Sequence, residues 1–161
     1  MIEVAIRIDA PGWRRRLPDA TRILRRAANA ALAGARAAPP LELTIVLSDD
    51  SRVRALNRDW RGEDAATNVL AFPAGPAPPG PPRLLGDVVL ALGTCAREAR
   101  AQGKTLAAHA THLVVHGVLH LLGHDHDRDR TASRMEALER RVLAGLGLDD
   151  PYAPRPRRRA A

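Results

Sequence analysis

All six histidines of the chain lie between residues 109 and 126, and the segment from His116 to His126 reads HGVLHLLGHDH. Imidazole is a poor filler of apolar cores and a good metal ligand, so this clustering indicates a metal site. His116 and His120 are four residues apart, and a helix places such residues on one face about one turn apart. Gly123 can adopt a positive φ and end that helix, after which the chain can bring His126 back toward the other two. The segment therefore predicts an apolar helix, a glycine break and a tripod of imidazoles.

Three neutral imidazoles would leave the fourth position of a tetrahedral zinc ion to water, as in catalytic zinc sites. We predict His116, His120 and His126 as the ligands of one ion per chain, although three histidines also suit nickel or copper. His112 is predicted to be a buried neighbour that orients a ligand, and His109 a partly exposed residue of the same helix. A purely structural histidine-rich helix is the alternative.

The chain has 161 residues, which is the length of one ordinary domain, and its apolar residues are mostly alanine and leucine. Its aromatic residues are Trp13, Trp60, Phe72 and Tyr152, so the core must be aliphatic. RNA-binding modules that stack bases on several aromatic platforms are therefore disfavoured.

The formal net charge is +7, and Lys104 is the only lysine beside many arginines. A basic surface suggests a polyanionic partner such as nucleic acid, although the arginine content can also reflect genomic base composition. We predict that residues 151–161, which hold four arginines, form a basic disordered tail behind a domain of residues 1–150.

Cys95 is the only cysteine, so no intrachain disulfide can form, as is typical of a reducing compartment. The first residues, MIEVAIRIDA, lack the layout of a signal peptide, and no apolar run approaches the ~20 residues of a membrane-spanning helix. These features predict a cytoplasmic protein without membrane contact.

Apolar periodicity predicts an α+β domain with a four-stranded mixed sheet and about five helices. Strands are expected at 2–8, 41–47, 69–72 and 84–92. Helices are expected from 23 to 32, from Ser48 and its two following aspartates to about 59, and at 94–102, 105–122 and 131–144. Proline-rich residues 73–82 are expected to form a surface loop.

The spacing H-x-x-x-H-x-x-G-x-x-H is similar to that of the metzincin proteases, which need a glutamate directly after the first histidine. This chain has Gly117 there, so the proteolytic base is absent. The chemistry that remains is hydrolysis by a metal-activated water, and the basic surface favours a phosphodiester substrate. Such a reaction needs a cation near the phosphoryl oxygens, and Arg61 is the candidate, unless it only pairs with Glu63 or Asp64.

Three segments carry a resemblance to a known family. The first runs from Leu56 to Pro73 with the pattern LN-x-x-WR-x-x-D-x-x-TNVL-x-FP, the second is LGDV at residues 85–88, and the third is the histidine block of residues 112–126. Their order and spacing resemble the YbeY family of bacterial, metal-dependent endoribonucleases associated with ribosomal RNA maturation. The resemblance covers about residues 41–146.

The resemblance implies a zinc ion on His116, His120 and His126, and a functionally important arginine at Arg61. It also implies cleavage of single-stranded RNA near the 3′ end of 16S ribosomal RNA, a role in ribosome quality control, and the small subunit and its assembly factors as partners. Asn68, in the TNVL segment, is expected to bind substrate beside Arg61.

This chain departs from the family's usual pattern at two positions: it has Trp60 and His124 where most members of the family have tyrosine. His124 stays open as a fourth ligand, a proton shuttle, a bystander or a substrate contact. The general base stays open among Asp125, His124 and the metal hydroxide. Two other functions also stay open: a metal-stabilised RNA-binding assembly factor with negligible nuclease activity, and a metalloprotease, which Gly117 disfavours.

Overall fold

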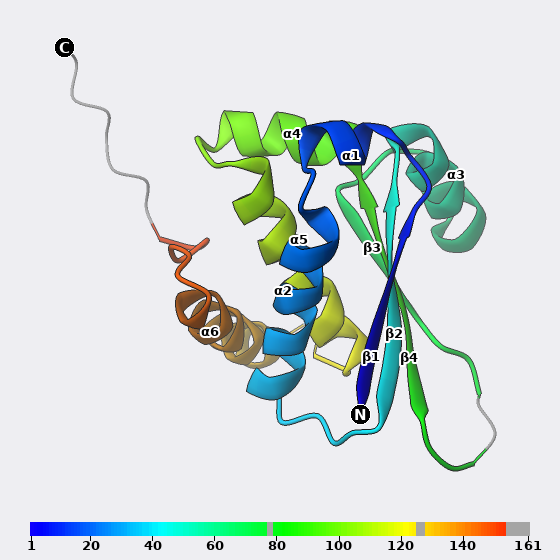
Figure 1. Ribbon diagram of the computed structural model, residues 1–161, viewed down its shortest axis with the longest axis vertical. Coiled ribbons are helices and arrows are strands. Elements are labelled where there is room, and N and C mark those ends of the chain that lie inside the picture. The colour runs from blue at the N-terminus through cyan, green and yellow to red at the C-terminus, as the bar shows by residue number, and fades with distance from the viewer. Residues whose placement is uncertain (77–78, 125–127, 154–161) are drawn as a thin grey trace.

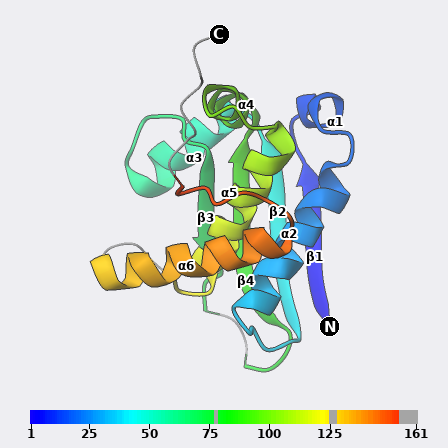
Figure 2. The same ribbon diagram turned by 90° about the vertical axis from the view of Figure 1, so that its left-hand side faces the viewer.

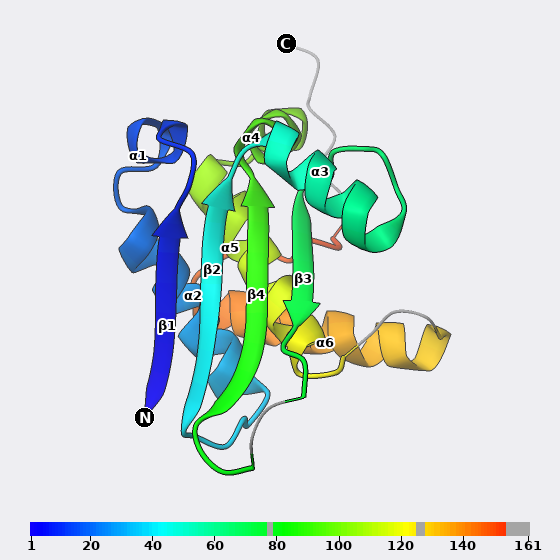
Figure 3. The same ribbon diagram turned by 90° about the vertical axis from the view of Figure 1, so that its right-hand side faces the viewer.

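Four strands form one mixed sheet, as the apolar alternation predicts. The structure, a computed structural model, describes residues 1–76, 79–124 and 128–153. The strands are β1 (Ile2–Ile8), β2 (Leu41–Ser48), β3 (Val69–Pro73) and β4 (Arg83–Ala91), in the order β1-β2-β4-β3 across the sheet (Figure 3). β1 and β4 each run parallel to β2, whereas β3 runs antiparallel to β4 and forms one edge. All four predicted strands are confirmed.

Six helices accompany the sheet within the described residues. They are α1 (Gly12–Arg16), α2 (Ala20–Gly34), α3 (Asp50–Arg61), α4 (Leu92–Ala101), α5 (Leu106–Leu121) and α6 (Asp129–Gly145). α2, α5 and α6 lie on one side of the sheet and α3 lies on the other (Figures 1 and 2). The predicted α+β class is confirmed, and α1 is the helix that the sequence patterns did not predict. None of these helices is long and apolar enough to cross a bilayer.

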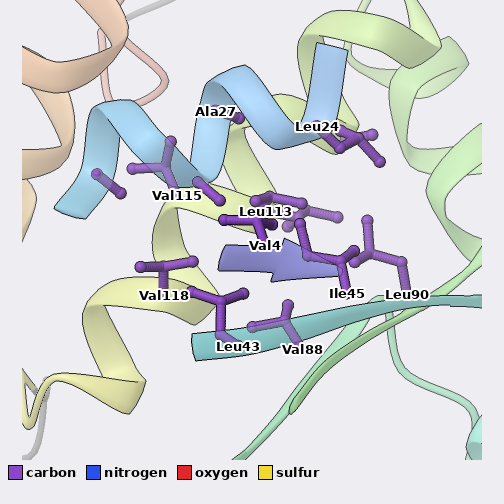
Figure 4. Packing of buried hydrophobic residues seen from close by; sticks show 14 of the residues in the cluster. Val4, Leu24, Ala27, Leu43, Ile45, Val88, Leu90, Leu113, Val115 and Val118 are labelled. Atoms are coloured by element: carbon purple, nitrogen blue, oxygen red, sulfur yellow. The ribbon is translucent and has the colours of Figure 1, made fainter. Parts of the chain in front are cut away.

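The apolar helix α5 lies at the centre of the core. Its residues Leu113, Val114 and Val118 are buried against β-sheet residues such as Ile45 and Val88, with α2 packed on its outer side (Figure 4). Burial on nearly all sides explains why this helix is apolar almost throughout. The histidines of α5 are therefore carried by a tightly packed element.

The helices α3 and α5 begin where a side chain can accept a hydrogen bond from a backbone N–H that has no partner within the helix. Asp49 caps α3 by accepting a hydrogen bond from the Arg52 N–H, whereas Ser48 is buried at the end of β2, so the helix signal was right but the cap is one residue later. Thr105 caps α5 by accepting a hydrogen bond from the Ala108 N–H, at the predicted start of this helix. Gly123, with φ of +94°, follows the last turn of α5 and confirms the predicted break.

Candidate metal centre

His116 and His120 present one ring nitrogen each to the same point. The two side chains lie one turn apart on α5, both half-buried, and their Nε2 atoms are 3.2 Å from each other. Two nitrogen ligands of one tetrahedral zinc ion, with bonds of 2.0–2.1 Å, are separated by about 3.3 Å. The spacing of these two nitrogens therefore fits a shared metal ion.

Glu139, from α6, holds the far side of the His116 ring. Its carboxylate accepts hydrogen bonds from His116 Nδ1 at 2.8 Å, from His112 Nε2 at 3.0 Å and from the Tyr152 hydroxyl at 2.7 Å. Burial alone would raise the pKa of Glu139, but the hydrogen bonds from the two histidines and Tyr152 outweigh it and lower the pKa to about 2. The carboxylate is thus ionised although the residue is fully buried.

Glu139 was not predicted as a site residue. Its position could have indicated a role, because it falls on the apolar stripe of α6 that Met135, Leu138 and Val142 define, and a carboxylate buried there needs hydrogen-bond partners. His112, predicted to be a buried neighbour that orients a ligand, is half-buried beside His116 and bonds to the same carboxylate. His112, His116 and Glu139 also form a group whose ligand atoms lie within 4.8 Å of one another and could hold a metal ion.

Arg61 and the histidines line one cleft. A hollow of about 230 Å³ is lined by Arg61, Val69, Ala71, Pro73, His116, Gly117 and His120. Its walls come from the end of α3, the edge strand β3 and the second half of α5. The fold thus brings the predicted cation and two predicted ligands to the same opening.

The Arg61 guanidinium is held by the backbone and by an aromatic ring. Its Nη2 donates to the Ala71 carbonyl at 2.9 Å, and its carbon lies 5.7 Å from the centre of the Phe72 ring. Asp64, a possible partner in the sequence, pairs instead with Arg54 at 2.7 Å, so the predicted alternative of an Arg61–Asp64 pair is wrong. A carbonyl carries no net charge, and among the described residues no carboxylate forms an ion pair with Arg61.

Gly117 lies between the cleft and the sheet. A Cβ atom at this position would lie 2.7 Å from Val88 Cγ1, which is closer than real carbon atoms approach. The glutamate that metzincins carry after the first histidine could therefore not be accommodated without a shift of Val88 or of α5.

A second polar cluster lies toward the other end of α5. His109 is buried and its Nε2 lies 2.9 Å from Glu98 Oε1, so the predicted partial exposure of His109 is wrong. Burial lowers the pKa of His109, against the opposing effect of Glu98. Asn68 donates to the same carboxylate at 2.9 Å and accepts from the Val69 N–H, so its amide is engaged within the protein.

Several predicted site residues lie at or beyond the limits of the described chain. His126 and Asp125 are outside the described residues, as are residues 154–161 of the predicted tail. His124 is half-buried and its backbone N–H bonds to the Leu119 carbonyl at 3.0 Å. Tyr152, placed in the tail by the sequence analysis, packs onto the domain through Glu139.

The fold and the cleft define a single-domain α+β protein with a histidine-rich candidate metal site beside an arginine that is anchored by a backbone carbonyl. The chain belongs to the YbeY family, whose model, described as endoribonuclease YbeY, matches residues 13–147. This confirms the resemblance found in the sequence.

Relatives named endoribonuclease YbeY match almost the whole chain. One from Paramagnetospirillum magneticum is 56% identical over 158 residues, covering 94% of this chain and 96% of the relative. One from Azorhizobium caulinodans is 52% identical over 155 residues, covering 94% and 97%. A solution structure from Thermotoga maritima, 19% identical, matches with a TM-score of 0.50 over 96% of this chain and all of that one, which supports the fold alone.

Proposed function

We propose that this chain is a zinc-dependent endoribonuclease that cleaves single-stranded RNA. The observation that carries the proposal is the common cleft of Arg61, His116 and His120. The names of the relatives support the reaction, and the resemblance to their family supports a role near the 3′ end of 16S ribosomal RNA, with ribosome quality control as part of it. The proposed partners are the small ribosomal subunit and its assembly factors, and the proposed location is the cytoplasm.

His116, His120 and His126 are the proposed zinc ligands. When bound, a zinc ion supplies Lewis acidity toward the phosphoryl group and a water of lowered pKa. His116 and His120 fit through the 3.2 Å separation of their Nε2 atoms. We favour these nitrogens over the set of His112, His116 and Glu139 because they line the cleft that also contains Arg61.

Arg61 is the proposed catalytic and substrate-binding cation. A guanidinium has five N–H donors, and the bond to Ala71 uses one of them, so a forked pair is available for two oxygens of a phosphate. Negative charge grows on those oxygens in the transition state, where a preorganised donor has its largest effect. Asn68, with its amide bonded to Glu98 and Val69, supports the cleft wall more directly than it can contact RNA.

Replacement of Arg61 tests the proposal. Arg61→Ala should lower single-turnover cleavage of a single-stranded RNA by about 10²–10³-fold while zinc content and melting temperature stay as in the wild type. Arg61→Lys should restore only part of the rate, because an ammonium lacks the fork. Arg58→Ala is the matched control, since Arg58 is exposed on the same helix and pairs with Asp59. Undiminished cleavage by a folded, zinc-loaded Arg61→Ala protein would remove Arg61 from the catalytic assignment.

The ligand assignment has its own test. His116→Ala, His120→Ala and His126→Ala should each lower the zinc content of the purified protein, measured by elemental analysis, whereas His109→Ala should retain it. Near-stoichiometric zinc in His126→Ala would exclude that residue from the ligand set. His124→Ala and Asp125→Asn, assayed for rate at full zinc content, then separate the candidates for the general base.

The proposed domain spans residues 1–150, and the tail adds electrostatic attraction for RNA. The logarithm of affinity for a single strand should fall with log salt by about 0.7 per phosphate neutralised. Deleting residues 154–161 should reduce that slope and leave the cleavage position unchanged. A shifted cleavage position would mean that the tail helps to select the site.

The net charge of +7 favours a second candidate, an RNA-binding assembly factor with negligible nuclease activity. Nuclease-free protein that binds RNA with zinc present and yields no Arg61-dependent cleavage would establish it. A metalloprotease is disfavoured by the packing at Gly117, and casein digestion is the direct test.

A further inference from the structure

We propose that Glu139, held by Tyr152, is a positioning residue that fixes the tautomer and ring orientation of His116. This inference rests on the proposed metal site, because it concerns how one of its ligands is prepared. It gives a role to Tyr152, which follows α6 and is not among the proposed ligands.

The three contacts of Glu139 determine where the His116 proton lies. Three polar side-chain atoms converge on the two oxygens of Glu139, one on Oε1 and two on Oε2, and a carboxylate surrounded in this way acts as the common acceptor of its partners. His116 Nδ1, 2.8 Å from Oε1, therefore carries the proton. The other nitrogen of the ring, Nε2, is then left with its lone pair, and this is the atom that faces His120 Nε2.

The second carboxylate oxygen is held in place from two directions. Oε2 accepts from His112 Nε2 at 3.0 Å and from the Tyr152 hydroxyl at 2.7 Å. Both donors lie close together, since the rings of His112 and Tyr152 meet edge to face with centres 6.0 Å apart. The carboxylate is therefore fixed in its plane and cannot rotate away from His116 without losing two bonds.

Tyr152 is itself held against α6. The Arg140 guanidinium lies 5.3 Å from the centre of its ring and also bonds to Asp150 at 3.1 Å. Burial and the neighbouring Glu139 raise the pKa of Tyr152, so its hydroxyl stays a donor at neutral pH. The chain after α6 is thus connected to His116 through one hydroxyl and one carboxylate.

A positioning role fits this geometry better than metal ligation by Glu139. Glu139 is fully buried and is absent from the residues that line the cleft, whereas His116 and His120 line it. Ligation by Glu139 together with His116 Nδ1 would also turn the lone pair of His116 away from His120. A carboxylate that accepts from Nδ1 leaves Nε2 to act as the proposed metal ligand in the cleft.

The experiment measures the His116 tautomer and the zinc affinity separately. In chelator-treated protein labelled with ¹⁵N at histidine, long-range ¹H–¹⁵N spectra should give His116 as the Nδ1–H form. Glu139→Gln should turn this into a mixture of tautomers and weaken zinc binding by about 10–100-fold in a competition with a chelating dye. Tyr152→Phe, which keeps the carboxylate, should shift both readouts in the same direction and by less.

Glu98→Gln is the matched control. The Glu98 carboxylate lies 2.9 Å from Nε2 of His109, another histidine of α5, but away from the cleft. This variant should leave the His116 tautomer unchanged and zinc affinity within twofold of the wild type. An equal loss of zinc affinity in Glu98→Gln would show a general effect of loosening α5 and would overturn the proposal.

Three further results would refute the positioning role. An unchanged tautomer in both Glu139→Gln and Tyr152→Phe would do so. So would zinc X-ray absorption spectra that show a carboxylate oxygen bound to the ion in the wild type and not in Glu139→Gln. If Glu139→Gln does not fold, unchanged zinc affinity and tautomer in Tyr152→Phe would suffice. A wild-type protein that binds no zinc would instead refute the proposed function, and the tautomer, measured without metal, would still decide the role of Glu139.

Discussion

Replacing Gly117 with alanine has two opposing effects on the free energy of unfolding, one from helix propensity and one from packing. An alanine in a helix is favoured over glycine by about 0.8–1 kcal/mol. The new methyl group, however, would lie 2.7 Å from Val88 Cγ1 and 3.2 Å from Cγ2, in a region where both residues are buried. Overpacking of this kind costs about 1–3 kcal/mol. We therefore expect Gly117→Ala to lower the free energy of unfolding by up to about 2 kcal/mol.

Val88→Ala should relieve the clash. By itself it removes two buried methyl groups and should cost about 2 kcal/mol, counting about 0.8 kcal/mol for each group and a small cavity. In the double variant the added methyl occupies part of that space, so the combined loss should be smaller than the sum by about 1–2 kcal/mol. Urea unfolding of the four proteins, in the presence of a chelator, measures this coupling.

Gly145→Ala is the control for helix propensity. Gly145 ends α6, and a Cβ there meets no atom within 4 Å, so this substitution should be neutral or stabilising. Two results would contradict close packing of Gly117 against Val88. One is that Gly117→Ala raises the free energy of unfolding by the full helix propensity of alanine. The other is that the loss in the double variant equals the sum of the two single losses. Zinc affinity, measured in parallel, should fall in Gly117→Ala because any retreat of α5 moves His116.

Three further predictions concern stability and reactivity. Burial raises the pKa of the Cys95 thiol to about 12, so a thiol-reactive dye at pH 8 should modify it only at the rate of unfolding, and rapid modification of native protein would contradict its burial. Asp49→Ala removes the cap of α3 and should cost about 0.5–2 kcal/mol in urea unfolding, with Asp59→Ala, near the end of the same helix, as the comparison. The folded-state pKa of Glu139, about 2, lies below its ordinary 4.5, so its contribution to the stability of metal-free protein is present above pH 4.5 and lost as the pH falls toward 2. Unfolding from pH 6 to pH 3 should therefore show a steeper loss in the wild type than in Glu139→Gln, and equal slopes would contradict the low pKa.

The elements with a periodic apolar stripe could be predicted from the sequence, and α1 could not. Its five residues are too few for a stripe, and Trp13 is buried because its indole N–H bonds to the Ser48 carbonyl, a partner 35 residues away. The strands and α5 carry their pattern within themselves, so local spacing sufficed for them.

In the candidate site, too, the residues that are close in the sequence could be predicted and their partners from other elements could not. His116 and His120 lie on one helix and Gly123 follows its last turn, so their relation is local. The partners of the α5 histidines come from elsewhere in the chain: Glu139, which contacts His116, from α6, and Glu98, which contacts His109, from α4. Contacts between elements depend on how the elements pack, and no spacing within one segment encodes them.

The anchor of Arg61 has a consequence for how this site changes in evolution. The guanidinium is held by the carbonyl of residue 71, and every amino acid supplies that oxygen. The side chain at position 71 can therefore vary without releasing the arginine, whereas an acidic anchor would be lost by a single substitution. Neutral drift at position 71 is thus uncoupled from the placement of the cation, and what must be retained there is the path of the backbone.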